Sequence, residues 1–226
     1  MEGMYNLVKD FFSHDMDLVD LFDSEAIIWI DWREYDEDVV NYFNDMMDEP
    51  IDIQIVSNGK PYGDDIVLKN GNKELQIPYG DEQDRDVTIK YFNDFVKPDY
   101  EVRWFAESLG NDTLGFTVLS GAEWAKLNDE FGADVVRYYF EPIDFESDMF
   151  NLGMDEVFAL LALREDSEGV NTQFSTQLDW IRIINKEKTL AEQKENGQID
   201  LKQYMVAKKE LQQSKDDFIA AHGPMK

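Results

Sequence analysis

Strand-like and helix-like hydrophobic patterns occupy different parts of this 226-residue chain. Before residue 148, short runs rich in β-branched and aromatic residues alternate with segments whose apolar residues recur at helical spacing. After residue 148 the helical spacing continues, and no segment alternates like a strand. Because the strand-like runs follow one another over short connections, we expect them to pair antiparallel. The pattern predicts an α+β fold: an antiparallel sheet with helices packed on one face, plus a C-terminal helical subregion.

We therefore expect an acidic α+β domain over residues 1–147 and a helical subregion over residues 148–226 that packs on it. The length suits one domain with an appendage. The sequence holds no internal repeat of fixed period and no low-complexity linker that would separate two independent domains.

Local signals place the individual elements. Apolar spacing predicts helices, and short β-branched or alternating runs predict strands. The expected helical segments are 5–22, broken near His14, then 36–49, 84–96, 120–131, 154–163, 174–188 and 201–221. The expected strands are 26–30, 51–55, 66–68, 75–77, 100–105, 113–119 and 135–140. A capping box is expected at Ser120 and Glu123, a hairpin turn at Gly71, and a helix cap at Asp200. The seam of a C-terminal helical hairpin is expected at Leu190, Ile199, Tyr204, Leu211 and Phe218.

Negative charge is concentrated in the first two thirds of the chain. The whole sequence has 21 Lys and Arg against 49 Asp and Glu, a net charge of −28. Residues 1–150 hold 11 of the basic and 36 of the acidic residues, a net charge of −25, whereas residues 151–226 carry −3. Direct binding to nucleic acid or to an anionic membrane is disfavoured, because both require clusters of Lys and Arg. A basic protein partner is favoured for the same electrostatic reason.

Signatures of catalysis and of cofactor binding are missing from the sequence. There is no cysteine, which excludes disulfides, thiolate metal sites and cysteine nucleophiles, and two histidines cannot supply a zinc cluster. Neither a nucleophile-elbow motif nor a glycine-rich phosphate loop is present. We expect no catalytic residues, no cofactor and no metal site, and hence a protein that is not an enzyme. The N-terminus does not resemble a signal peptide and no run is long enough to span a membrane, so we expect a cytoplasmic protein without a membrane partner.

Carboxylates crowd among large apolar side chains in residues 29–49. If Val39, Phe43 and Met47 turn inward on the predicted helix, the acids lie outside together with Asn41 and Asn44. Acid clusters recur at 64–65, 81–84 and 144–148, and this recurrence favours a binding surface over a merely solvated helix face. The predicted partner-binding residues are Asp31, Trp32, Glu34, Tyr35, Glu37, Asp38, Asp45, Asp48, Glu49, Asp64, Asp65, Asp81, Glu82 and Asp84.

Aromatic side chains beside these acids are candidate anchors for a partner, since aromatic residues dominate binding energy at interfaces. The candidates for exposed anchors are Trp32, Tyr35, Tyr42, Tyr62 and Tyr79. We expect the core to hold Trp29, Trp104, Phe116 and Trp124 instead.

Over residues 26–143 the chain resembles the immunity proteins that bacteria make against their own nuclease or other polymorphic toxins. The features that carry the resemblance are Trp29-Ile-Asp-Trp32, Asn111-Asp-Thr-Leu-Gly-Phe116 and Phe131-Gly132, in a small, strongly acidic, cysteine-free α+β context. The resemblance implies tight, electrostatically steered binding to a basic toxin domain, at its active site or nearby. It implies no catalytic residues.

Three alternatives stay open on the sequence alone. The acidic surface could imitate nucleic acid and block a DNA-binding enzyme, which predicts several unrelated basic partners rather than one. A hydrolase could use paired carboxylates and a divalent ion. The C-terminal helices could bind a partner through an amphipathic stripe.

Overall fold

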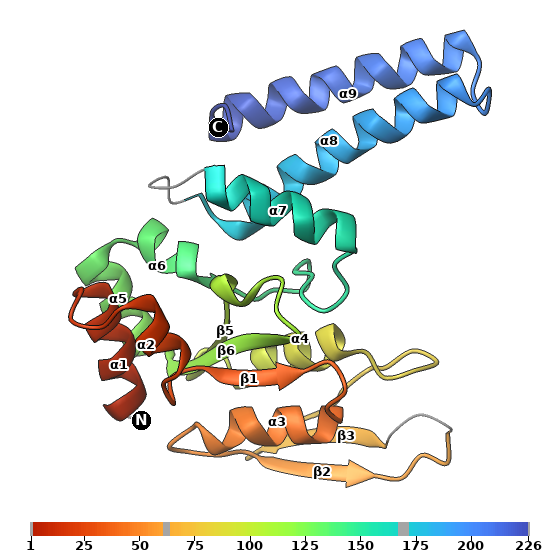
Figure 1. The fold of residues 1–226 in the computed structure, drawn as a ribbon. Helices are drawn as coiled ribbons and strands as arrows, with labels where there is room; N and C mark the ends of the chain where they lie inside the picture. Colours follow the sequence, from red (N-terminus) through yellow and green to blue (C-terminus); the bar gives the residue numbers. More distant parts are fainter. Residues whose placement is uncertain (1, 61–63, 167–171, 226) are drawn as a thin grey trace. The chain divides into compact units, whose positions relative to one another are not determined.

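Helices and strands are interspersed up to residue 142 in the computed structural model of the chain, and the regular elements described after it are helices (Figure 1). The structure describes residues 2–60, 64–166 and 172–225. The chain divides into two compact units, Met1–Leu152 and Gly153–Lys226, which we call the acidic unit and the helical unit. The sequence pattern changes slightly earlier, at 147/148.

The acidic unit holds most of the regular elements. Its helices are α1 (Glu2–Phe12), α2 (Leu18–Phe22), α3 (Asp36–Asp45), α4 (Arg85–Val96), η1 (Ala106–Ser108), α5 (Gly121–Phe131) and α6 (Ala133–Tyr139). Its strands are β1 (Ile28–Asp31), β2 (Asp52–Val56), β3 (Asp65–Asn70), β4 (Lys73–Gln76), β5 (Tyr100–Phe105), β6 (Thr113–Ser120) and β7 (Phe140–Pro142). The helical unit holds α7 (Met154–Asp166), α8 (Phe174–Glu195) and α9 (Leu201–His222).

The predicted α+β class is confirmed, with the strands divided between two antiparallel sheets. The larger sheet has the order β1-β6-β5-β7, and the smaller has the order β2-β3-β4. The hairpin predicted around Gly71 is β3–β4, and Gly71 has a φ of 58°, which glycine adopts without strain. Helix α3 packs against both β1 and β2, so it lies between the two sheets (Figure 1).

Helices cover both faces of the larger sheet, whereas the sequence pattern predicts one covered face. Phe105 pairs with Gly115, so the side chains of Phe105 and Phe116 point to opposite faces. Phe43 of α3 contacts Phe116 on one face, and Phe22 of α2 contacts Phe105 on the other. The central strand β6 is buried along almost its whole length, which explains its continuous apolar run.

The predicted strand at 135–140 is wrong, because residues Ala133–Tyr139 form helix α6 and only Phe140–Pro142 pair as strand β7. Gly132, with a φ of 94°, allows the chain to turn directly from α5 into α6. Val136 is fully buried in the core formed with α1 and α5. Tertiary packing here overrides the strand preference of valine and tyrosine.

Gly121, the first residue of α5, lies tightly against the chain that precedes β5. A Cβ atom at this position would lie 2.5 Å from the carbonyl oxygen of Pro98. We predict that Gly121→Ala lowers the free energy of unfolding by about 1–3 kcal/mol, because backbone atoms must shift to remove the overlap. Urea denaturation measures this change. Gly80→Ala, where a Cβ would meet nothing within 4 Å, is the control; equal stability of the two variants would contradict the prediction.

The predicted C-terminal helical hairpin is confirmed. Trp180 of α8 contacts Phe218 of α9, with ring centroids 5.2 Å apart, and Lys194 lies over the ring of Tyr204. Asp200 caps α9 as predicted, since its carboxylate accepts a hydrogen bond from the Gln203 N–H at 2.8 Å. Within the residues that the structure describes, no helix is long and apolar enough to cross a membrane.

Candidate partner-binding surface

The connection from β1 to α3 is a turn that leaves two aromatic side chains in solvent. The Asp31 carboxylate accepts a hydrogen bond from the Arg33 N–H at 2.8 Å, and the Asp31 carbonyl accepts one from the Glu34 N–H at 3.1 Å. Trp32 is 63% exposed and Tyr35 is 73% exposed. Both predicted anchors are therefore accessible to a partner.

Arg85, at the start of α4, holds this turn in place. Its Nε donates to the Asp36 carboxylate at 2.5 Å, and its Nη1 donates to the Asp31 carbonyl at 2.8 Å. Its Nη2 donates to the Glu34 carbonyl. Asp36 is only 4% exposed, so the ion pair is largely removed from water. One guanidinium thus fixes three points of the segment that carries Trp32 and Tyr35.

Asp36 has a second partner on α4. The Thr88 hydroxyl donates to the other Asp36 oxygen at 2.7 Å, and the Tyr79 hydroxyl lies 2.7 Å from Thr88 Oγ1. Burial raises the pKa of Tyr79. The prediction that Tyr79 is an exposed anchor is wrong, because the residue is only partly exposed and its hydroxyl belongs to this network.

The other two aromatic residues predicted to be exposed anchors are Tyr42 and Tyr62. Tyr42 is exposed on α3, and its hydroxyl donates to the Glu34 carboxylate at 3.1 Å. This hydrogen bond raises the pKa of Tyr42. Tyr62 lies outside the described residues.

Three of the predicted acidic segments meet around the turn. The Asp64 N–H donates to the Glu37 carboxylate at 3.2 Å, and the Gln83 amide donates to the Asp64 carbonyl at 2.9 Å. With the Arg85 contacts, these bonds bring residues 31–38, 64 and 81–85 together. We call the result the Trp32 surface, defined by Trp32, Glu34, Tyr35, Asp38 and Asp64.

Some of the predicted acids already serve the fold. The Asp65 carboxylate accepts hydrogen bonds from Asn58 and Gln76. Asp84 caps α4 through the Val87 N–H and also accepts from Asn151. These two carboxylates have less capacity left for a partner than their neighbours.

Asn44 is buried, although the sequence pattern places it on the outer stripe of α3. Its side-chain amide donates to the Ile51 carbonyl at 3.0 Å, and its side-chain oxygen accepts from the Ile51 N–H at 2.8 Å. This reciprocal pair fixes the C-terminal end of α3 to the start of the smaller sheet.

One group of predicted acids lies away from the turn. Asp45, Asp48 and Glu49 are exposed at or just after the C-terminal end of α3, whereas Asp81 and Glu82 are exposed in the segment that meets the turn. A helix of this length spans about 15 Å, so α3 separates one group of acids from the Trp32 surface. The structure therefore divides the predicted site instead of gathering all of it.

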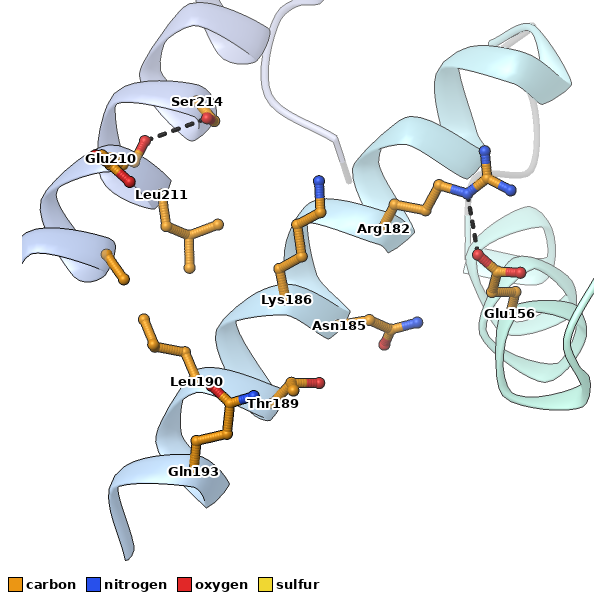
Figure 2. Close-up of a pocket in the computed structure, with 11 residues that line it drawn as sticks. Glu156, Arg182, Asn185, Lys186, Thr189, Leu190, Gln193, Glu210, Leu211 and Ser214 are labelled. Carbon is orange, nitrogen blue, oxygen red and sulfur yellow. Dashed lines mark hydrogen bonds and ion pairs between the residues drawn. The ribbon is translucent and has the colours of Figure 1, made fainter. Parts of the chain in front are cut away.

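A groove lies within the helical unit, between α8 and α9 (Figure 2). This groove has a volume of about 570 Å³. Leu190 and Leu211 face it from opposite helices, and the Arg182 Nε donates to the Glu156 carboxylate at 3.0 Å at one end. The groove shows where the hairpin seam is incompletely filled. The alternative that these helices bind a partner stays a prediction.

Sequence reasoning missed Arg85, the residue that organises the surface. The N-cap of α3 is Tyr35, and the Asp36 side chain turns inward to Arg85, 49 residues along the chain. The only available signal was the occurrence of a single basic residue within the acidic run 81–86.

No protein-family model, curated protein or solved structure matches the chain. Within the described ranges, no group of three or more His, Cys, Asp and Glu side chains is placed to hold a metal ion.

Proposed function

We propose that this protein is an acidic inhibitor that binds a basic protein partner, in the manner of an immunity protein that neutralises a toxin such as a nuclease. The observation that carries the proposal is the exposure of Trp32 and Tyr35 on a turn fixed by the buried Arg85–Asp36 pair. A turn whose backbone is already fixed loses less entropy when a partner binds, and exposed aromatic side chains supply much of the binding energy at interfaces.

The charge of the acidic unit supports the same proposal. Most of its few basic side chains are already engaged with carboxylates of the same unit. The pairs are Lys9–Glu130, Lys69–Glu74, Arg85–Asp36, Lys90–Asp148, Lys97–Glu101 and Arg103–Glu101. Because residues 1–150 contain 36 acidic residues against 11 basic ones, the unit keeps a large net negative charge, which would attract a basic protein and accelerate its approach.

Capture of partners by the tagged full-length chain from its native lysate, over a salt series, tests the proposal. We expect one basic polypeptide at one-to-one stoichiometry. Trp32→Ala should weaken its binding by about 30-fold or more, as removal of an interface anchor does. Phe158→Ala, which removes an exposed aromatic side chain of the helical unit, is the control and should bind like the wild type. Equal binding by the Trp32 and Phe158 variants would contradict the assignment of the surface.

The rivals give different results in the same experiment. Retention of several unrelated DNA-binding proteins would favour a nucleic-acid mimic. If no protein is retained at low salt, both the dedicated inhibitor and the nucleic-acid mimic would be contradicted. This result would favour the carboxylate-dependent hydrolase. Neutralising Glu34 and Asp38 together should slow association of a dedicated partner and reduce the salt dependence of its binding.

A further inference from the structure

The two edges of the smaller sheet differ in how they meet solvent. Strand β4 forms one edge with Lys73, Glu74 and Gln76, and the Lys73 ammonium donates to the Phe95 carbonyl at 2.6 Å. Charged side chains of this kind are a common protection of sheet edges. Strand β2 forms the other edge, where Ile55 is 43% exposed and Val56 is 46% exposed. Along β2 the only charged side chain is Asp52 at its start, so the exposed stretch from Ile55 to Val56 lacks such protection.

An apolar row of the sheet continues out to the β2 edge. Ile53 pairs with Leu68, and Ile55 pairs with Ile66, so these four side chains share one face. Ile66 and Leu68 are fully buried, whereas Ile55 is not. Among the described residues, β3 is the only strand that pairs with β2. One more strand beside β2 would continue both the apolar row and the backbone hydrogen bonding.

The charges around β2 indicate what kind of strand fits. Asp48, Glu49 and Asp52 lie at its start, and Asp65 pairs with Val56 at its end. A second copy of this chain, itself carrying a charge of −28, would bring like charges together at this edge. A basic segment would be attracted to these carboxylates, chiefly to those at the start of the strand, because Asp65 already accepts hydrogen bonds from Asn58 and Gln76. The edge therefore favours a basic partner over self-association.

We infer that β2 is a docking edge on which an extended, basic segment of the partner adds a fourth strand to the β2-β3-β4 sheet. The basic character of that partner rests on the proposed function. Because α3 packs on β2 and Glu37 accepts a hydrogen bond from Asp64, the edge and the Trp32 surface belong to one continuous part of the acidic unit. Backbone pairing supplies affinity at such an edge, and alternate side chains supply specificity.

A synthetic peptide of about seven residues, in which lysine and valine alternate, tests the edge without knowledge of the natural partner. Amide hydrogen exchange at residues 52–56 of the full chain should slow by about tenfold or more when this peptide is bound. A peptide of equal charge with a central proline should give no such protection, because proline breaks the strand pairing. Equal binding of both peptides without protection at β2 would overturn the inference.

Two matched variants of the protein localise the effect. Ile55→Lys places a positive charge on the edge and should abolish protection by the alternating peptide. Val19→Lys makes the same change at an exposed site on α2 and should leave protection unchanged. If the natural partner binds through Trp32 while β2 remains unprotected, the docking edge is wrong and the proposed function stands. If the peptide protects β2 but the lysate yields no basic partner, the proposed function fails and the docking edge stands.

Discussion

Replacing Arg85 by methionine is expected to lower the free energy of unfolding by about 3–5 kcal/mol, the usual cost of leaving one member of a buried ion pair alone. Asp36 is 4% exposed, and in this variant the Thr88 hydroxyl would be the one remaining partner of its carboxylate among the described residues. The carbonyls of Asp31 and Glu34 would lose their donor as well. Chemical denaturation of the full chain measures the loss.

A double-mutant cycle separates the ion pair from the other contacts of Arg85. Asp36→Asn removes the buried charge. Arg85→Met should therefore lower the free energy of unfolding by less in the Asp36→Asn background than in the wild type. Arg85→Lys keeps the positive charge but cannot donate to three separated acceptors, and it should fall between the wild type and Arg85→Met. A variant Arg85→Met as stable as the wild type would show that the turn is held by other contacts.

The same variants connect stability to binding. If the partner binds Trp32 and Tyr35 in the positions that Arg85 fixes, Arg85→Lys should weaken partner binding even when the protein remains folded. The turn would be more mobile in this variant, and it would have to become ordered when the partner binds.

Asp86→Ala is expected to cost about 2–4 kcal/mol, because three backbone donors would lose one shared acceptor. Asp86 is fully buried on α4, and its carboxylate accepts from the N–H groups of Met149, Phe150 and Asn151 at 3.0, 2.9 and 3.2 Å. These bonds fix the segment that places Phe150 beside Phe116 and Arg85. Thermal and chemical denaturation measure the change.

The stability lost in Asp86→Ala should depend on pH in a definite direction. Burial raises the pKa of Asp86 above its ordinary value of 3.8, although the three N–H donors oppose the change. The folded chain therefore holds this proton more tightly than the unfolded chain. The stability that Asp86 contributes is fully present below 3.8 and decreases as the pH rises through the folded pKa. The gap in unfolding free energy between wild type and Asp86→Ala should narrow from acidic to neutral pH; a widening gap would contradict this assignment.

Local signals predicted those parts of the fold that short-range interactions decide. The capping box at Ser120 and Glu123, the cap at Asp200 and the turn at Gly71 each depend on residues within one turn of the chain, and all are present. The α+β class followed from the separation of strand-like and helical patterns. Residues 135–140 became a helix because burial of Val136 against distant helices outweighed local preference.

The candidate site was harder to predict, because its organisation depends on distant residues. Exposure of Trp32 and Tyr35 was predictable from their acidic surroundings. The inward turn of Asp36 was not, because its partner Arg85 lies on another helix. Tyr79 has acidic neighbours in sequence, yet its hydroxyl meets Thr88 in a partly buried network. Acidic neighbours in the sequence therefore predicted an exposed aromatic residue only where that residue makes no contact with a buried side chain from another element.

Helix α3 is anchored independently at its two ends, by Asp36 to Arg85 and by Asn44 to Ile51. The groups of acids at these ends are consequently held at a constant separation of about 15 Å, the length of the helix. A basic surface can satisfy both groups only if its cations are spaced to match. If a basic partner contacts both groups, as the proposed function requires, then α3 would select among cationic proteins by the positions of their charges and not by their total charge alone.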